Sequence, residues 1–213
     1  MEKHFDRSYG IAVLVSVAFL TFTVGLHPAG GGIEHLIEAT PLIVSTHTIA
    51  IISVPVLLYG MFGFSRLLGF DSNLSIAGLI TFSTSMFAVI IAAALNGLAL
   101  PFFISGLKDA DENTLDVSRQ ILRYGFSVNQ AFDVIFIIFV SAAVVIWSIA
   151  ILKSKNFPAW LGVFGLLAGS LALITLASGF VLTQLSGFRV FMAGFILWLV
   201  AAGYFLLRRA SKD

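Results

Sequence analysis

The sequence has no cysteine and little charge, and both shortages exclude classes of protein. Without cysteine, the chain forms neither disulfides nor thiolate metal sites, and it has no cysteine nucleophile. Charged residues make up only 11% of its 213 residues, whereas a soluble domain carries about 25%. Hydrophobic residues make up 59%, and the formal net charge is +1. The composition therefore predicts an integral membrane protein that contacts the lipid bilayer and has no nucleic-acid partner.

Six apolar runs are long enough to cross a bilayer, because a hydrocarbon core of roughly 30 Å takes about 20 residues of helix. They lie at about 8–27, 41–63, 75–99, 124–152, 158–183 and 188–207. Each run is apolar all round, unlike the alternating segments of a membrane β-barrel. We therefore predict an all-α, polytopic fold in which residues 1–213 form a single transmembrane domain, a bundle of six helices.

The basic residues predict how this bundle is oriented. With the N-terminus inside, eight of the 12 Lys and Arg residues face the cytoplasm, as the positive-inside rule favours: Lys3, Arg7, Arg66, Lys153, Lys155, Arg208, Arg209 and Lys212. The other four face outward: Lys108, Arg119, Arg123 and Arg189. Five aromatic residues then fall near the inner ends of their spans, where an interfacial belt is expected: Tyr9, Tyr59, Trp147, Trp160 and Tyr204. Both termini are predicted to be cytoplasmic.

On this topology, the polar residues within or next to the spans collect on the outer side. The candidate polar site comprises His47, Asn96, Asn129, Asp133, Gln184 and Arg189. Asp133 is the only acidic residue inside a span, and such a residue is costly unless it has a partner. The partner is either Asn129, one helical turn away, or a side chain on another helix, Arg189 or His47.

The stretch HPAGGGIEHLIEATP, residues 27–41, interrupts the apolar sequence after the first span. We predict a short exterior loop over 27–40, in which the glycines allow a tight turn with backbone shapes that other residues avoid. Residues 33–39 are expected to form a short interfacial helix. Thr40 followed by Pro41 indicates the N-cap and first turn of the second span.

Five side chains in and near this loop are candidate metal ligands: His27, Glu34, His35, Glu38 and His47. Imidazole and carboxylate suit a transition metal, and a pair of imidazoles from neighbouring helices also suits haem b. Their spacing matches no compact metal motif. The alternatives are an interfacial role for His27, a solvated one for His35 and a polar contact between helices for His47.

The segment ISGLKDADENTLDVSRQILRYG, residues 104–125, is the longest exterior stretch. Acidic residues precede its apolar pattern and Arg residues follow them, as suits a helix dipole. We predict that this amphipathic segment extends the fourth span outward, with Leu115, Ile121 and Leu122 on its apolar face.

From Asp133 onward, the chain has a polar start, a long apolar span that ends in ILKSKNF, and then PAWLGVFGLLAGSLALI. This pattern, which covers the C-terminal third, resembles small six-span bacterial membrane proteins of unknown function. The resemblance implies a multi-pass protein of the bacterial inner membrane and transfers no functional residue. The small residues in GLLAGSLAL predict close packing between helices.

Three functions remain open on the sequence. In the first, the outer polar site holds a metal ion or haem. In the second, the chain is an accessory subunit of a larger membrane complex or a homo-oligomer, and its polar residues join helices. The third is a membrane-embedded enzyme or transporter, in which Asp133 and His47 form a proton-exchanging pair.

Overall fold

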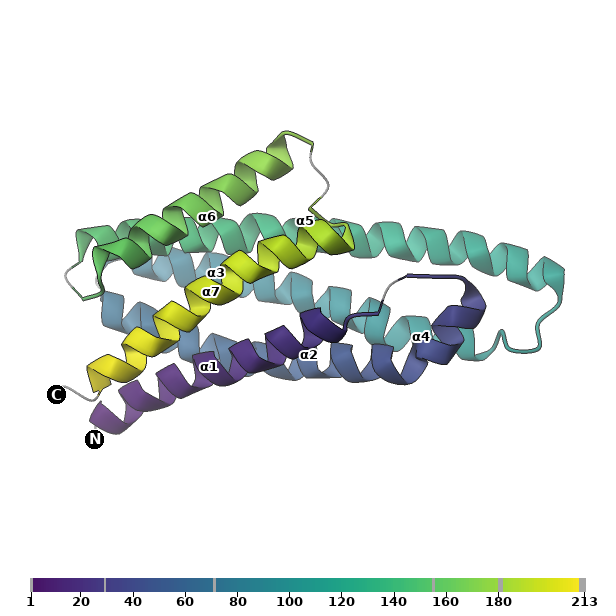
Figure 1. Cartoon of the computed structure of the whole chain (residues 1–213), viewed down its shortest axis with the longest axis horizontal. Coiled ribbons are helices and arrows are strands. Elements are labelled where there is room, and N and C mark those ends of the chain that lie inside the picture. Colours follow the sequence, from purple (N-terminus) through teal and green to yellow (C-terminus); the bar gives the residue numbers. More distant parts are fainter. Residues whose placement is uncertain (1, 29, 71, 155, 180–181, 211–213) are drawn as a thin grey trace.

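The computed structural model describes residues 2–28, 30–70, 72–154, 156–179 and 182–210 (Figure 1). Its elements are α1 (Glu2–Leu26), α2 (Ile33–Leu68), α3 (Asn73–Ala94), the π-helix η1 (Leu95–Ala99), α4 (Leu100–Ser105), α5 (Glu112–Lys153), α6 (Ala159–Ala177) and α7 (Leu185–Ala210). Because α3, η1 and α4 follow one another without a break, they count as one span. The described residues contain six helices long and apolar enough to cross a membrane. The predicted all-α, six-span fold is thereby confirmed.

Both chain ends lie at one end of the bundle (Figure 1). We call it the terminal end, and we call the opposite end, where α1 passes into α2 and α6 into α7, the loop end. Termini on the same side agree with an even number of spans. The side of the membrane that they face remains a prediction.

The core toward the terminal end is built from large aromatic side chains. The rings of Trp147 and Trp198 stack with centroids 6.1 Å apart, and Phe64 meets both edge to face. The indole nitrogen of Trp147 donates a hydrogen bond to Ser65 Oγ at 3.0 Å. Trp147 is therefore a core residue, and the predicted interfacial belt was wrong for it and for Tyr9, which is also buried. The other three aromatic residues of that belt are exposed: Tyr59, Trp160 and Tyr204.

Glycines set the closest approaches between helices. A Cβ atom on Gly60 of α2 would lie 3.0 Å from the backbone nitrogen of Val13 and 3.1 Å from the carbonyl oxygen of Tyr9, both on α1. A Cβ on Gly169 of α6 would lie 2.9 Å from the carbonyl oxygen of Ser141 on α5. This contact agrees with the close helix packing predicted for GLLAGSLAL.

The helix α5 spans nearly the whole length of the molecule (Figure 1). Its 42 residues measure about 63 Å at 1.5 Å per residue, which is about twice the hydrocarbon thickness. At the loop end, Leu122 packs with Leu36 and Ile43 of α2 and with Ile104 of α4 in a second, smaller core. The segment before the fourth span is therefore part of the same continuous helix, at the loop end of the bundle. Leu115 joins this second core as expected, while Ile121 is exposed.

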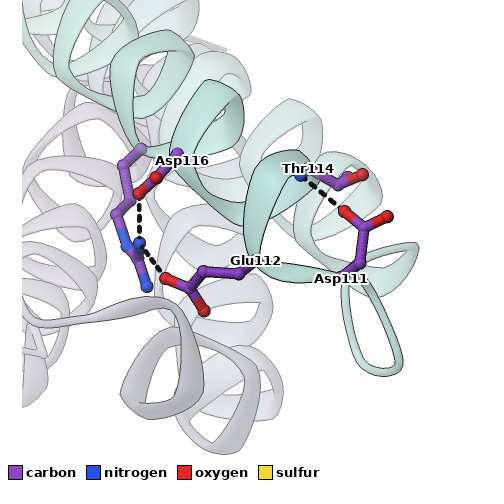
Figure 2. Close-up of polar contacts among 5 residues, drawn as sticks. Asp111, Glu112, Thr114 and Asp116 are labelled. Carbon is purple, nitrogen blue, oxygen red and sulfur yellow. Dashed lines mark hydrogen bonds and ion pairs between the residues drawn. The ribbon is translucent and has the colours of Figure 1, made fainter.

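Asp111 caps the start of α5 (Figure 2). Its side chain accepts a hydrogen bond from the backbone nitrogen of Thr114 at 2.8 Å, and this bond holds the pKa of the carboxyl below its ordinary value. Arg119 then pairs with Glu112 at 2.8 Å and with Asp116 at 2.6 Å. These ion pairs are exposed, so they contribute little to stability. The cap fixes where α5 begins, and residues on the apolar side of this helix, Leu115 and Leu122, pack into the second core.

The segment after α1 differs from the prediction. The expected interfacial helix at 33–39 is the beginning of α2, so the connection from α1 ends at Gly32 and does not extend to residue 40. Pro41 lies inside the helix, and Thr40 is not an N-cap, because its hydroxyl donates to the carbonyl oxygen of Leu36. The first turns of α2 run at an angle to the rest of the helix, as a proline inside a helix explains (Figure 1).

The glycines of the connection also have a different role from the predicted one. Among the described residues, only Gly69 and Gly179 have a positive φ, so Gly30, Gly31 and Gly32 adopt no conformation reserved for glycine. Gly31 instead leaves room for the ring of His35, because a Cβ there would lie 2.5 Å from its Cδ2 atom.

We expect Gly60→Ala to lower the thermal stability of the purified protein, because the added methyl meets backbone atoms of α1 that cannot move aside. Overpacking of this kind costs about 1–3 kcal/mol, more than the roughly 1 kcal/mol of helix propensity gained. The matched control is Gly25→Ala, since no atom lies within 4 Å of a Cβ at that position. A melting temperature of Gly60→Ala at or above that of the wild type would contradict this close approach of α1 and α2.

Candidate functional site

A cavity of about 270 Å³ lies toward the loop end of the bundle. Six elements line it: α1, α2, α3, η1, α5 and α7, together with the two connections at this end. Its polar lining residues are Thr23, His27, His47, Asn96, Asn129, Asp133 and Thr183. We call it the histidine cavity. It gathers four of the six residues of the predicted polar site: His47, Asn96, Asn129 and Asp133.

The two histidines of the cavity are neighbours. His27 follows the last residue of α1 and His47 lies within α2, and their ring centroids are 5.1 Å apart in an edge-to-face arrangement. Thr23 helps to join the two helices, since its hydroxyl donates to the carbonyl oxygen of Thr46 at 3.3 Å. The packing of α1 on α2 therefore brings together two histidines that are twenty residues apart in the sequence.

Backbone carbonyl groups fix how both imidazoles are protonated. His47 Nδ1 lies 2.7 Å from the carbonyl oxygen of Ile43, and His27 Nδ1 lies 3.0 Å from that of Pro28. A carbonyl oxygen only accepts, so Nδ1 carries the proton in each ring and Nε2 is left with its lone pair. Within the described part of the chain, neither Nε2 atom has a hydrogen-bond partner. The histidine cavity thus contains two unprotonated imidazole nitrogens.

Asp133 is held by its own helix. Asn129 Nδ2 donates to Asp133 Oδ2 at 3.0 Å, one turn along α5. This is the local partner considered from the sequence, and the described residues include no ion pair between Asp133 and Arg189 or His47. The bond leaves the second carboxylate oxygen, Oδ1, without a partner among the described residues. Asn129 Oδ1 is buried and also has no partner there.

His47 is seated against a glycine that the sequence analysis missed. A Cβ on Gly97 of η1 would clash with the Cβ of His47 and lie 2.7 Å from its Cγ, so only glycine fits beside this histidine. Four residues later, Pro101 lacks the N–H that would bond to the carbonyl of Gly97, which explains why the helix widens into a π-turn there. Glycine four residues before proline in an apolar span was the available signal.

Burial is the main reason that His27 is neutral. Burial lowers its pKa below the ordinary 6.5, and the positive charge of Arg189 lowers it further, while the hydrogen bond to Pro28 acts in the opposite direction. At neutral pH the imidazole therefore acts as a hydrogen-bond acceptor through Nε2.

Two residues of the predicted polar site lie outside the cavity. The side chains of Gln184 and Arg189 are exposed and do not line it. The residue that lines it in this region is Thr183, whose hydroxyl accepts a hydrogen bond from Gln130 Nε2 at 2.8 Å. Both were assigned to the site from depth alone, and depth does not say which way a side chain points.

Of the five predicted metal ligands, the structure brings together only His27 and His47. His35, Glu34 and Glu38 are exposed on the first turns of α2, away from His27 and His47. The described residues contain no group of three or more His, Cys, Asp or Glu side chains arranged to hold a metal ion. A cavity of about 270 Å³ is also small for a porphyrin, since pockets for drug-sized ligands already measure roughly 300–1000 Å³. The volume of the cavity therefore argues against a haem.

Comparison of the chain with protein-family models, with curated proteins and with solved structures gave no match. The site must therefore be interpreted from its own geometry.

We expect Gly97→Ala to push η1 away from α2 and to lower the melting temperature, with a cost of about 1–3 kcal/mol for the overpacking. His47→Gly removes the atoms that the methyl meets, so the same substitution should cost less in that background. A double-mutant cycle measures this coupling. Gly125→Ala is the control, because a Cβ there has no atom within 4 Å. Equal costs in both backgrounds would show that His47 and Gly97 are not in contact.

The lowered pKa of His27 gives a pH dependence with a definite sign. The folded protein binds this proton more weakly than the unfolded chain, so His27 should lower stability progressively as the pH falls through 6.5, and leave it unchanged above. His27→Gln should therefore lose less thermal stability than the wild type between pH 7 and pH values below 6.5. A control with His35→Asn, at an exposed position, should follow the wild type. Identical profiles for wild type and His27→Gln would refute this interpretation.

Proposed function

We propose that the protein binds a small polar molecule in the histidine cavity and exchanges protons or hydrogen bonds with it through His47 and Asp133. It would act as a membrane-embedded transporter or enzyme, in a bacterial inner membrane and with both termini cytoplasmic. The loop end would then face outward. The observation that carries the proposal is that two unprotonated imidazole nitrogens and a carboxylate line one cavity in an otherwise apolar bundle.

The free-energy cost of burying polar side chains in a membrane protein supports a functional role for His47 and Asp133. A polar group inside a membrane protein is expensive unless it is hydrogen-bonded, and ionisable residues there mark substrate or proton pathways. If these side chains only joined helices, they would bond across helices. Instead His47 and Asp133 each bond within their own helix, to Ile43 and Asn129, and keep other polar atoms open to the cavity. This arrangement favours ligand binding over an accessory role.

The arrangement also favours a small molecule over a metal ion. Structural zinc sites use four protein ligands and catalytic ones use three. The described residues offer no set of three. The cavity volume of about 270 Å³ suits a ligand smaller than most drug-sized molecules.

A thermal-shift panel tests this function. Purified protein is heated with small amines, carboxylic acids, neutral alcohols and amides, and divalent metal ions. A ligand at 100 times its Kd stabilises by about 2.7 kcal/mol, which corresponds to roughly 5–10 °C for a chain of this size. We expect one organic class to give such a shift in the wild type and in His35→Asn, and a much smaller one in His47→Gln and Asp133→Asn.

Three results would reject the proposal. The first is that no class stabilises the protein, and the second is a shift that both cavity variants retain; either would favour the accessory role. The third is stabilisation by a divalent metal alone that depends on His27 and His47, which would favour the metal module.

A further inference from the structure

Three polar atoms on residues that line the histidine cavity are hydrogen-bond acceptors without a partner among the described residues. They are Nε2 of His27, Nε2 of His47 and Oδ1 of Asp133. Asn129 is only 9% exposed, and its Oδ1 has no partner among the described residues. An unpaired buried acceptor costs about 1–3 kcal/mol, so a ligand that donates hydrogen bonds recovers that cost.

The side-chain donors that remain in the described part of the cavity lining are the amide of Asn96 and the hydroxyl of Thr183. The hydroxyl of Thr23 already donates to Thr46, and the amide of Asn129 already donates to Asp133. Among the described residues no Lys or Arg side chain lines the cavity, and Arg189 is exposed outside it. An anionic ligand would therefore find no cation in the lining itself; a cation that acts on the cavity, Arg189, lies outside it, and its positive charge lowers the pKa of His27. A cation would find the carboxylate of Asp133.

The rest of the lining is apolar. Val24, Val89, Phe136, Phe188 and Met192 line the same cavity, and the rings of Phe136 and Phe188 have centroids 6.2 Å apart. A ligand that fills the space must therefore combine a donor-rich charged end with an apolar body. A bare inorganic cation would leave this apolar lining unused.

We propose that the histidine cavity binds a small primary ammonium ion with an apolar substituent. The proposal rests on the proposed function and names its ligand class. An ammonium group has three N–H donors, which face the carboxylate of Asp133 and the Nε2 atoms of His27 and His47. The substituent lies against the phenylalanines. The small volume limits it to about one ring or a short aliphatic chain.

The test compares three probes that share one apolar body: benzylamine, benzyl alcohol and benzoate. Binding is measured by titration calorimetry of the purified protein at pH 7.5, where the amine is protonated. The nitrogen resonances of labelled histidine provide a second readout, because Nε2 of His27 and of His47 should shift when they accept a hydrogen bond. We expect benzylamine to bind at least tenfold more tightly than the alcohol and the acid.

Variants identify the charge partner. Asp133→Asn should weaken benzylamine binding by about ten- to hundredfold, as expected for loss of a charged hydrogen-bond partner. Asp133→Glu keeps the charge and should retain binding within a few fold. His35→Asn is the matched control for histidine substitution outside the cavity. Thermal unfolding of each unliganded variant establishes that weaker binding does not reflect a failure to fold.

The outcomes separate this inference from the function on which it rests. One outcome is that benzylamine does not bind, while benzyl alcohol or benzoate binds and loses affinity when His47 is substituted. The ligand class is then wrong and the proposed function stands. Benzylamine binding that Asp133→Asn leaves unchanged also overturns the ligand class. If no probe and no member of the wider panel binds in dependence on His47 or Asp133, both proposals fail. Zinc alone, bound through His27 and His47, overturns both as well.

Discussion

The hydrocarbon region holds no water, so each backbone N–H and C=O group there must find its partner inside the protein. This constraint makes nearly all of the described chain helical. It also makes departures from regular helix informative. Pro41, Pro55 and Pro101 each remove a backbone donor, and a π-turn follows from the third. Pro41 and Pro101 lie toward the loop end, near the second core and the histidine cavity.

The same constraint explains how the polar side chains are held. His47 uses Nδ1 to reach a carbonyl of its own helix, and Asp133 accepts from Asn129 one turn away. Each group is thus oriented by a local bond and keeps its remaining polar atoms for the cavity. Gly97 completes the arrangement, because its missing side chain lets η1 close over His47. Local bonds fix the chemistry of each group, and packing brings the groups together.

The predictable part of the site was the part that depends on helical spacing. Asn129 and Asp133 are four residues apart, so their hydrogen bond could be anticipated, and the similar depth of His47 and Asn96 agrees with their lining one cavity. Gln184 and Arg189 share that depth but are exposed, since rotation about the helix axis cannot be inferred from depth. The start of α2 was misplaced because Thr40 and Pro41 match a helix start, yet packing of Leu36 and Ile43 against α4 and α5 continues the helix through them.

Composition and run length by themselves determined that this is a six-span helical membrane protein, because transfer into lipid depends on the summed hydrophobicity of each segment and not on its neighbours. Only the tertiary structure decided that His27 meets His47, that His35, Glu34 and Glu38 stay apart from them, and that Gly97 seats the histidine. These are contacts between helices, and they depend on crossing angles and side-chain directions that no single segment encodes.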